Sequence, residues 1–400
     1  MKPDDVKRYA AEVLHRFDPD EETTCTEIGD GNINYVFRVR SLRDGRSVIV
    51  KQADKRLRSS GRPLDIYRSR IEAQALQLES RLAPDYIPEV YHYDETMAAL
   101  SMEDISAYRN LRKELLAGRI YGHLAENIST FLAQSLLPTT DLVLDRREKK
   151  RRVQFFTNPE LCDITEDLVL TEPYWNYKGR NIVTPGNEDF VRTFLYENDA
   201  LHREVGRLRN GFMNNAQALL HGDLHTGSIF ANEQGVKVID PEFAFYGPMG
   251  YDIGNVIGNL FFSWANKAFT GAGAEQTAAV RSLIADLCDK TAEKLAEKYN
   301  ATDEEASYTG KTRTLFAYLA RRVDMPIAPP YMPMENAYGT QEKVLHITNG
   351  QGGETIAEKA VWTVIFRRAR AKRYSTDGIL GLYRKRVVHR SEGGMNDFSL

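Results

Sequence analysis

The chain has 400 residues, of which 42% are hydrophobic and 27% are charged, and this balance is typical of folded globular proteins. It excludes a collagen, a coiled coil and a wholly disordered chain. The formal net charge of −3 argues against binding to nucleic acid through overall charge, and the length suits about two to three packing units.

An amphipathic helix is predicted over residues 4–17, because apolar side chains recur there at helical spacing. The segment 24–52 is predicted to form three antiparallel strands, with a glycine-containing turn at 29–34 and a second turn at 44–45. The other elements of this part are a helix and two strands, at 66–82, 88–93 and 98–103. This order indicates an α+β unit of about a hundred residues.

The pattern becomes helical from Asn110 onward. Three long periodic segments are predicted as helices, at 119–136, 187–220 and 273–299, and 236–239 is predicted as a short β element between them. The change of pattern divides the chain into an N-terminal lobe, 1–104, and a C-terminal lobe, 105–400.

The chain contains three cysteines, Cys25, Cys162 and Cys288, whose spacing matches no metal or redox motif. So few thiols, in an odd number, favour a reducing compartment. The apolar stretch 256–264 is shorter than a membrane-spanning helix needs, and residues 1–5 do not open a signal peptide. We therefore expect a cytoplasmic protein without a membrane or nucleic-acid partner.

The strongest motif is HGDLHTGSIF at 221–230, followed after a short strand by IDPEF at 239–243. Asp223 suits a catalytic base on a loop, and Asp240 and Glu242 suit a divalent metal held against ATP phosphates. Protein kinases use this order of a catalytic aspartate, a strand and a metal-binding aspartate. The alternative is that these acids are exposed turn residues, but their occurrence together favours the functional interpretation.

A second pattern joins a glycine-containing loop to a lysine. The loop GDGNIN at 29–34 could cradle a phosphate with its backbone N–H groups, although an Asp-Gly hairpin is also common for structural reasons. Lys51 ends the apolar strand that follows, where kinases place a phosphate-binding lysine paired with a helix glutamate. Glu72 is the candidate partner, and Glu79 lies on the same helix. A solvated lysine at a strand end is the alternative.

Taken together, these segments resemble the methylthioribose kinases, within the wider group of aminoglycoside phosphotransferase-like and choline kinase-like small-molecule kinases. The residues that carry the resemblance are 27–37, 50–53, 102–104, 156–166, 221–230 and 240–250. The wider group usually has asparagine at the position of Ser228, whereas methylthioribose kinases have serine there, as this chain does. The resemblance covers about two thirds of the chain, from about residue 20 to about 265.

This resemblance implies a bilobed protein-kinase-like α+β fold, with a small antiparallel-sheet lobe that binds ATP and a mainly helical lobe that binds the substrate. The residues it assigns to the nucleotide are Asn34, Lys51, Glu103, Asp104, Ile105, Asp240, Pro241 and Glu242. Asp240 and Glu242 would also hold Mg²⁺, and Glu103 to Ile105 would contact adenine. Asp223 would be the catalytic residue that holds the sugar hydroxyl, and Asp252 would brace its loop.

Family members also carry an Arg-Arg pair that binds the substrate. This chain has two candidate pairs, Arg321-Arg322 and Arg367-Arg368. We favour Arg367 and Arg368, because the aromatic segment 361–363 precedes them much as one does in the family. Either pair could instead lie on a solvated helix face.

The implied reaction is ATP-dependent phosphorylation of the C1 hydroxyl of 5-methylthioribose, a step in methionine salvage. The resemblance also implies a possible homodimer. Two alternatives remain open. One is a related kinase of another hydroxyl substrate, such as 5-deoxyribose or an amino alcohol. The other is a kinase-like protein that binds ATP without turnover.

Overall fold

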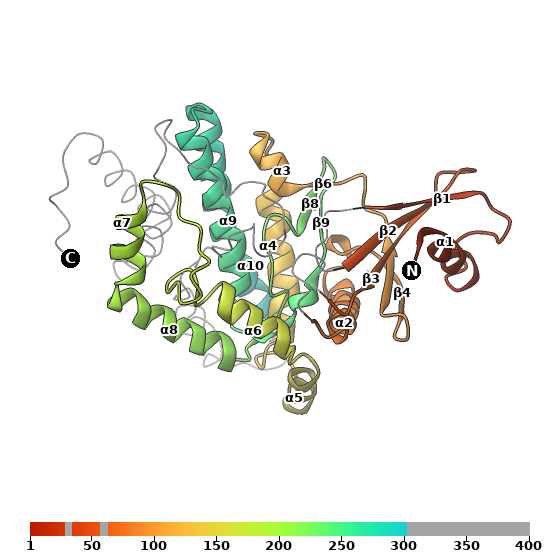
Figure 1. The fold of residues 1–400 in the computed structure, drawn as a ribbon, viewed down its shortest axis with the longest axis horizontal. Helices are drawn as coiled ribbons and strands as arrows, with labels where there is room; N and C mark the ends of the chain where they lie inside the picture. Colours follow the sequence, from red (N-terminus) through yellow and green to blue (C-terminus); the bar gives the residue numbers. More distant parts are fainter. Residues whose placement is uncertain (29–33, 57–62, 302–400) are drawn as a thin grey trace.

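The computed structural model describes residues 1–28, 34–56 and 63–301. An N-terminal lobe built on an antiparallel sheet lies beside a mainly helical C-terminal lobe (Figure 1). The elements of the N-terminal lobe are α1 (Pro3–Glu12), β1 (Thr23–Glu27), β2 (Asn34–Ser41), β3 (Ser47–Ala53), α2 (Tyr67–Leu82), η1 (Pro84–Tyr86), β4 (Val90–Asp94) and β5 (Ala99–Glu103).

The elements of the C-terminal lobe begin with β6 (Arg109–Asn110), α3 (Leu111–Leu116), α4 (Leu124–Leu136), η2 (Leu137–Thr139), α5 (Arg146–Phe155) and α6 (Pro159–Leu168). They continue with α7 (Glu188–Val191), η3 (Arg192–Tyr196), α8 (Asp199–Asn214), β7 (Ala218–Leu220), β8 (Ile229–Ala231), β9 (Val236–Val238), η4 (Pro241–Phe243), β10 (Phe245–Gly247), α9 (Gly250–Phe269) and α10 (Ala274–Ala301). Helix α10 packs against both α4 and α9 in the interior of this lobe.

The five-stranded sheet has the order β1-β2-β3-β5-β4, and every neighbouring pair is antiparallel. Side chains alternate between the two faces of a strand. On β3, Val48 and Val50 therefore pack under α1, whereas Ile49 and Lys51 face the C-terminal lobe. Because successive side chains of β3 point to opposite faces, Lys51 lies on the face that meets the C-terminal lobe.

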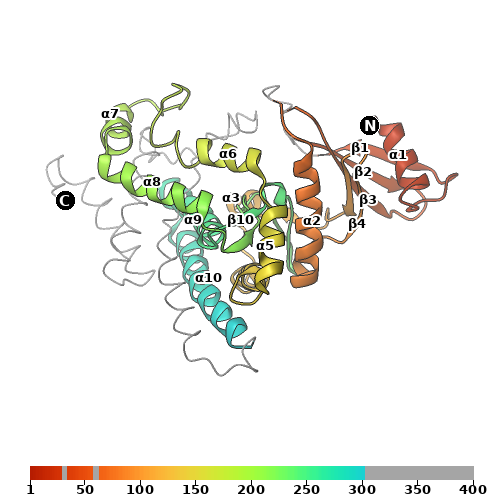
Figure 2. The same cartoon turned by 90° about the horizontal axis from the view of Figure 1, so that it is seen from below.

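Helix α2 lies between the two lobes (Figure 2). Its residues Ile71, Ala75 and Leu78 are buried in a cluster with Phe156 and Tyr246 of the C-terminal lobe. Helical spacing of three and four residues brings these three side chains onto one face. The helix that follows the first three strands is therefore fixed on the larger lobe by apolar burial.

Most predicted elements of the N-terminal lobe are confirmed. Strands β1 to β5 and helix α2 lie where the pattern placed them, as do β9 and α10 farther along. The predicted helix over 4–17 was wrong in its end, because α1 stops at Glu12 and His15 takes a φ of 51°. This turn brings Phe17 back into the cluster that covers Val6 and Tyr9, so the apolar spacing reflects the core and not a longer helix.

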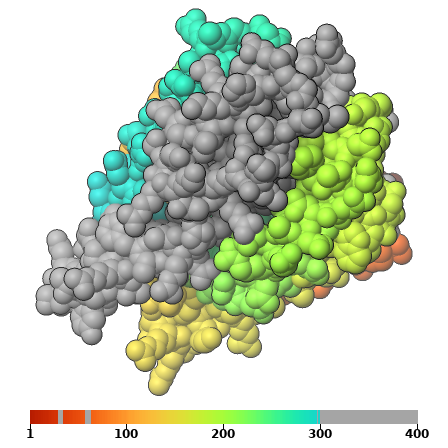
Figure 3. Space-filling view, turned by 90° about the vertical axis from the view of Figure 1, so that its left-hand side faces the viewer, coloured from red at the N-terminus to blue at the C-terminus, as the bar shows by residue number. Residues whose placement is uncertain are grey.

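The predicted single helix over 187–220 was also wrong. The chain forms α7, the π-helical turn η3 and α8 there, and ends in β7. The side chain of Asn198 accepts a hydrogen bond from the N–H of Leu201 and so starts α8 as a new helix. Helices α7 and α8 lie along one side of the end face shown in Figure 3.

Four α-helices of the described ranges were not predicted, namely α3, α5, α6 and α9. The apolar stretch 256–264 lies inside α9, where most side chains are buried. Within the described ranges, no helix combines the length and apolarity that a membrane crossing needs.

Candidate active site

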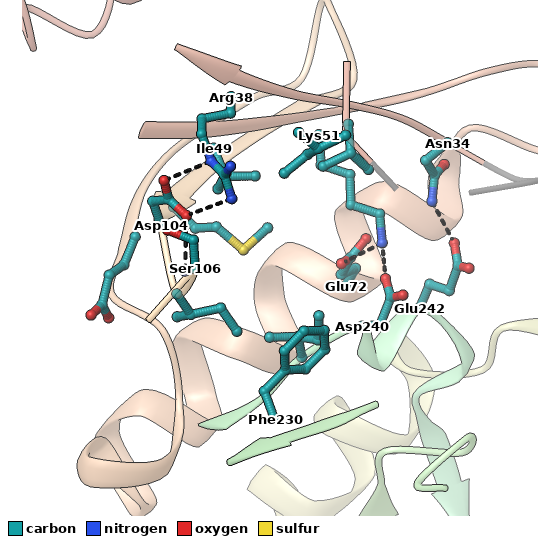
Figure 4. A pocket seen from close by; sticks show the side chains of 16 residues that line it. Asn34, Arg38, Ile49, Lys51, Glu72, Asp104, Ser106, Phe230, Asp240 and Glu242 are labelled. Atoms are coloured by element: carbon teal, nitrogen blue, oxygen red, sulfur yellow. Dashed lines mark hydrogen bonds and ion pairs between the residues drawn. The ribbon is translucent and has the colours of Figure 1, made fainter. Parts of the chain in front are cut away.

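A cavity opens between the inner face of the sheet and the C-terminal lobe (Figure 4). Its wall on the sheet side comes from β2, β3 and β5, and its wall on the other side includes Phe230 and Ile239. The predicted nucleotide residues that line it are Asn34, Lys51, Glu103, Asp104, Ile105, Asp240 and Glu242. Pro241 is buried in η4, and neither it nor Asp223 lines this cavity.

Lys51 lies at the centre of the charged side chains of the cavity (Figure 4). Its Nζ lies 2.8 Å from Oε1 of Glu72 and forms an ion pair with Asp240. Burial alone would lower the pKa of Lys51, but Asp240 and Glu72 outweigh it and raise that pKa, so the ammonium is held charged. The predicted pairing with a helix glutamate is present, and its partner is Glu72.

Asp240 follows β9 and takes a left-handed φ of 75°, which turns the chain sharply into η4. Its carboxylate is half exposed, and Lys51 lowers its pKa against the opposing effect of burial. Glu242, two residues on, is buried and accepts a hydrogen bond of 2.9 Å from Nδ2 of Asn34. The carboxylates of Asp240 and Glu242 therefore lie at the same edge of the cavity.

These carboxylates suit a hard divalent cation, because oxygen donors are the ligands that Mg²⁺ prefers. Within the described ranges, no group of three or more His, Cys, Asp and Glu side chains could enclose a metal by itself. The pair formed by Asp240 and Glu242 therefore fits a Mg²⁺ ion that takes its other ligands from phosphate oxygens and water.

The linker between the lobes is anchored by the side chain of Asp104. This carboxylate forms an ion pair of 2.8 Å with Nε of Arg38, and it accepts hydrogen bonds from Oγ of Ser47 and from the N–H of Ser106. Burial would raise the pKa of Asp104, but the Ser47 hydroxyl and the Arg38 guanidinium outweigh it and lower that pKa. The side chain of Asp104 thus serves to fix the linker on the sheet.

Asp223 stands on the loop between β7 and β8. The loop is held from below by Asp252 of α9, which accepts the backbone N–H of His221 at 2.7 Å and of Gly222 at 3.1 Å. Gly222 has a φ of 82°, and a Cβ there would meet the carbonyl oxygen of Phe243 at 2.2 Å. Only glycine fits this close approach.

Two neutral histidines order the same loop. Nε2 of His221 donates to the carbonyl of Ile239, just before Asp240, and burial lowers the pKa of this imidazole. Nδ1 of His225 accepts the N–H groups of Gly227 and Ser228, so its proton resides on Nε2, which lies 3.5 Å from Oδ2 of Asp223. The hydrogen bonds therefore aim His225 at Asp223.

Some predicted residues lie outside the described ranges. They are the glycine-loop residues 29–33 and the arginine pairs Arg321-Arg322 and Arg367-Arg368. Three contributors to the site were missed, namely Arg38, Arg68 and His225. Arg38 lies four residues after Asn34 on the same strand, so the strand period places both on one face. Arg68 lies four residues before Glu72, so the helix period places these two on one face. Either period could have indicated the arginine as a site residue.

Comparisons with known proteins agree on one family. The model of the phosphotransferase enzyme family (APH) matches residues 24–286. Methylthioribose kinase of Geobacillus sp. (strain WCH70) is 44% identical over 241 residues, which are 60% of each chain. Methylthioribose kinase of Pectobacterium atrosepticum is 41% identical over 286 residues, which are 71% of each chain. The chain thus spans about 60% of the length of the first of these relatives.

Among solved structures, Plasmodium vivax ethanolamine kinase is 14% identical, with a TM-score of 0.42. The match covers 94% of this chain and 86% of that one.

Proposed function

Because the chain belongs to the phosphotransferase enzyme family, we propose that it transfers the γ-phosphoryl group of ATP to the C1 hydroxyl of 5-methylthioribose. The bond between the sugar oxygen and the γ-phosphorus forms, and the bond from that phosphorus to the β,γ-bridging oxygen breaks. The hydroxyl proton leaves the sugar, and the products are 5-methylthioribose 1-phosphate and ADP. The names of relatives that are 41% to 44% identical support the sugar as substrate.

The observation that carries the phosphoryl-transfer proposal is the position of Lys51. A charged ammonium faces the cavity and is held between Glu72 and Asp240. In this proposal Lys51 binds phosphate oxygens of ATP, and Asn34 binds the nucleotide from the end of the glycine loop. Because the carboxylate of Asp104 is tied to the sheet, the linker backbone between Glu103 and Ile105 stays in place to contact adenine.

Asp240 and Glu242 are proposed to hold Mg²⁺, which neutralises developing charge on the phosphates when it is bound. Pro241 joins these two residues and fixes the backbone between them. Both carboxylates lie within reach of buried cations, since Lys51 pairs with Asp240 and Arg68 lies near Glu242. Each acid of the pair therefore has a cation beside it.

Asp223 is proposed to orient the sugar hydroxyl and to accept its proton late in the transfer. Its loop is braced by Asp252, and His225 points Nε2 toward its carboxylate. Little covalent chemistry is required of the protein, and positioning with charge neutralisation supplies most of the rate.

Arg367 and Arg368 are proposed to bind the substrate, with Arg321 and Arg322 as the alternative pair. Arginine suits phosphate oxygens because its planar fork offers parallel donors. We further propose that the enzyme acts in methionine salvage in the cytoplasm, and that it works as a homodimer.

A panel of hydroxyl substrates in an ADP-release assay tests the substrate. 5-Methylthioribose should give the highest kcat/KM, with 5-deoxyribose and an amino alcohol as competitors. Preference for either competitor would replace the sugar assignment while keeping the kinase. ATP binding without release of ADP in the presence of any of the three would support the non-catalytic alternative.

A further inference from the structure

Arg68 is a buried cation that the assignments above leave without a role. It lies in the first turn of α2, and its side chain is 1% exposed. Its guanidinium donates to the backbone carbonyls of Asp54 and Asp65, each at 2.8 Å. Burying a guanidinium so completely is costly unless it is paired, so its remaining partners indicate its purpose.

Two further partners in the described part of the chain belong to the proposed nucleotide site. The guanidinium donates to Oδ1 of Asn34 at 3.0 Å, and its Nε lies 3.7 Å from Oε2 of Glu242. The amide of Asn34 donates in turn to the same oxygen of Glu242 at 2.9 Å. Oε2 of Glu242 therefore has two partners. One is the guanidinium of Arg68, and the other is the amide of Asn34, which Arg68 orients.

The charges around Asp240 and Glu242 fall into two groups. Lys51 pairs with Glu72 and Asp240, whereas Arg68 forms an ion pair with Glu242. The guanidinium of Arg68 and the amide of Asn34 both contact Oε2 of Glu242, and together they restrain the orientation of this carboxylate.

Arg68 is also held rigidly. Helix α2 is fixed on the C-terminal lobe by Ile71, Ala75 and Leu78, and Glu242 belongs to η4 of the same lobe. Asn34 is the last residue of the predicted glycine loop and the first residue of β2. Arg68 thus contacts Asn34 in the N-terminal lobe and Glu242 in the C-terminal lobe, and so links the two lobes at the proposed metal site.

We propose that Arg68 is a positioning residue that holds the carboxylate of Glu242 in place for Mg²⁺ and fixes the amide of Asn34 beside it. This role rests on the proposed function, because it presumes that Glu242 holds the metal of a bound nucleotide.

The first test measures how Mg²⁺ strengthens ADP binding, by calorimetry on the full chain. Arg68→Met removes the charge at similar length, Arg68→Lys keeps the charge without the fork, and Arg70→Met is a matched control at a half-exposed arginine of the same helix. Arg68→Met should raise the Mg²⁺ concentration needed about 10- to 100-fold, as expected for loss of a supporting partner of a metal ligand. ADP binding without Mg²⁺ should weaken less than ADP binding with Mg²⁺, because only the latter uses Glu242.

Arg68→Lys should lie between Arg68→Met and the wild type, and Arg70→Met should match the wild type. The same Mg²⁺ requirement for Arg68→Met and the wild type would overturn the role.

The second test needs neither turnover nor nucleotide, so it separates this role from the proposed function. Urea unfolding is measured for Arg68→Met in the wild-type and Glu242→Gln backgrounds. A neutral amide at 242 needs no counter-charge, so Arg68→Met should lower the unfolding midpoint less than half as much there as in the wild type. If Arg68→Met fails to fold alone, Glu242→Gln should restore folding. An equal loss in both backgrounds would overturn the role even if the wild type proves to be a kinase.

Discussion

Glu79 gives a quantitative prediction about stability and pH. Its side chain lies on α2, 4% exposed, and its Oε2 has no hydrogen-bond partner in the described part of the chain. Burial, reinforced by the negative charge of Asp252, raises the pKa of Glu79 from its ordinary 4.5 to about 8. The folded protein therefore keeps a proton that the unfolded chain releases above its own, lower pKa.

Stability from this proton is complete below pH 4.5 and is lost as the pH rises through about 8. One proton is worth about 1.4 kcal/mol per pH unit, so the wild type should lose about 2 kcal/mol between pH 5.5 and 7.0 through this group. Glu79→Gln keeps the shape without the proton and should lack this loss. Asp252, whose pKa burial raises to about 7, titrates in both proteins and largely cancels in the comparison.

Urea unfolding at several pH values between 5.5 and 7.0 measures the effect. The free energy of unfolding of Glu79→Gln, relative to the wild type, should rise by about 2 kcal/mol across this range. Glu89→Gln, at an exposed position, is the control and should follow the wild type. If Glu79→Gln and the wild type show the same dependence on pH, Glu79 is ionised in the folded protein and the reasoning fails.

Three further predictions concern the reaction. Asp223→Asn should lower kcat about a hundred- to ten-thousand-fold while calorimetry finds ATP affinity nearly unchanged, and activity within tenfold of wild type would remove its catalytic role. Glu242→Gln should act mainly by raising the Mg²⁺ requirement, which a Mg²⁺ titration of the rate measures; an equal loss at every Mg²⁺ concentration would contradict a metal-ligand role. Arg368→Ala should lower turnover about thirty- to a thousand-fold, far more than it lowers ATP affinity. A silent Arg368→Ala beside an impaired Arg322→Ala would move the substrate clamp to residues 321–322.

The N-terminal lobe was predicted well because its strands carry local signals. Apolar residues and the Asp44-Gly45 turn between them specify β2 and β3 without help from the rest of the chain. Helices of the C-terminal lobe are harder to predict, since burial on several sides blurs their periodicity. Helix α9 shows this, because its residues are buried around most of its circumference and no single apolar stripe marks it.

The candidate site shows the same division between local motifs and distant partners. Lys51 and the pair Asp240 and Glu242 stand in short motifs whose chemistry is readable from spacing. The ion pair of Arg38 with Asp104 joins residues 66 positions apart, and Arg68 reaches Glu242 across a far longer separation. Periodicity can place Arg38 and Arg68 on a face, but the carboxylate that each one pairs with is fixed by the tertiary packing and not by a local pattern.

The central claim is that this protein moves the γ-phosphoryl group of ATP to C1 of 5-methylthioribose, and the product identifies the reaction most directly. Purified full-length protein is incubated with ATP, Mg²⁺ and 5-methylthioribose, and the product is examined by phosphorus NMR. We expect a phosphomonoester signal coupled to the anomeric proton, formed in equal amount to ADP. ADP without such a signal, or a phosphorus coupled to a proton other than the anomeric one, would contradict the assignment.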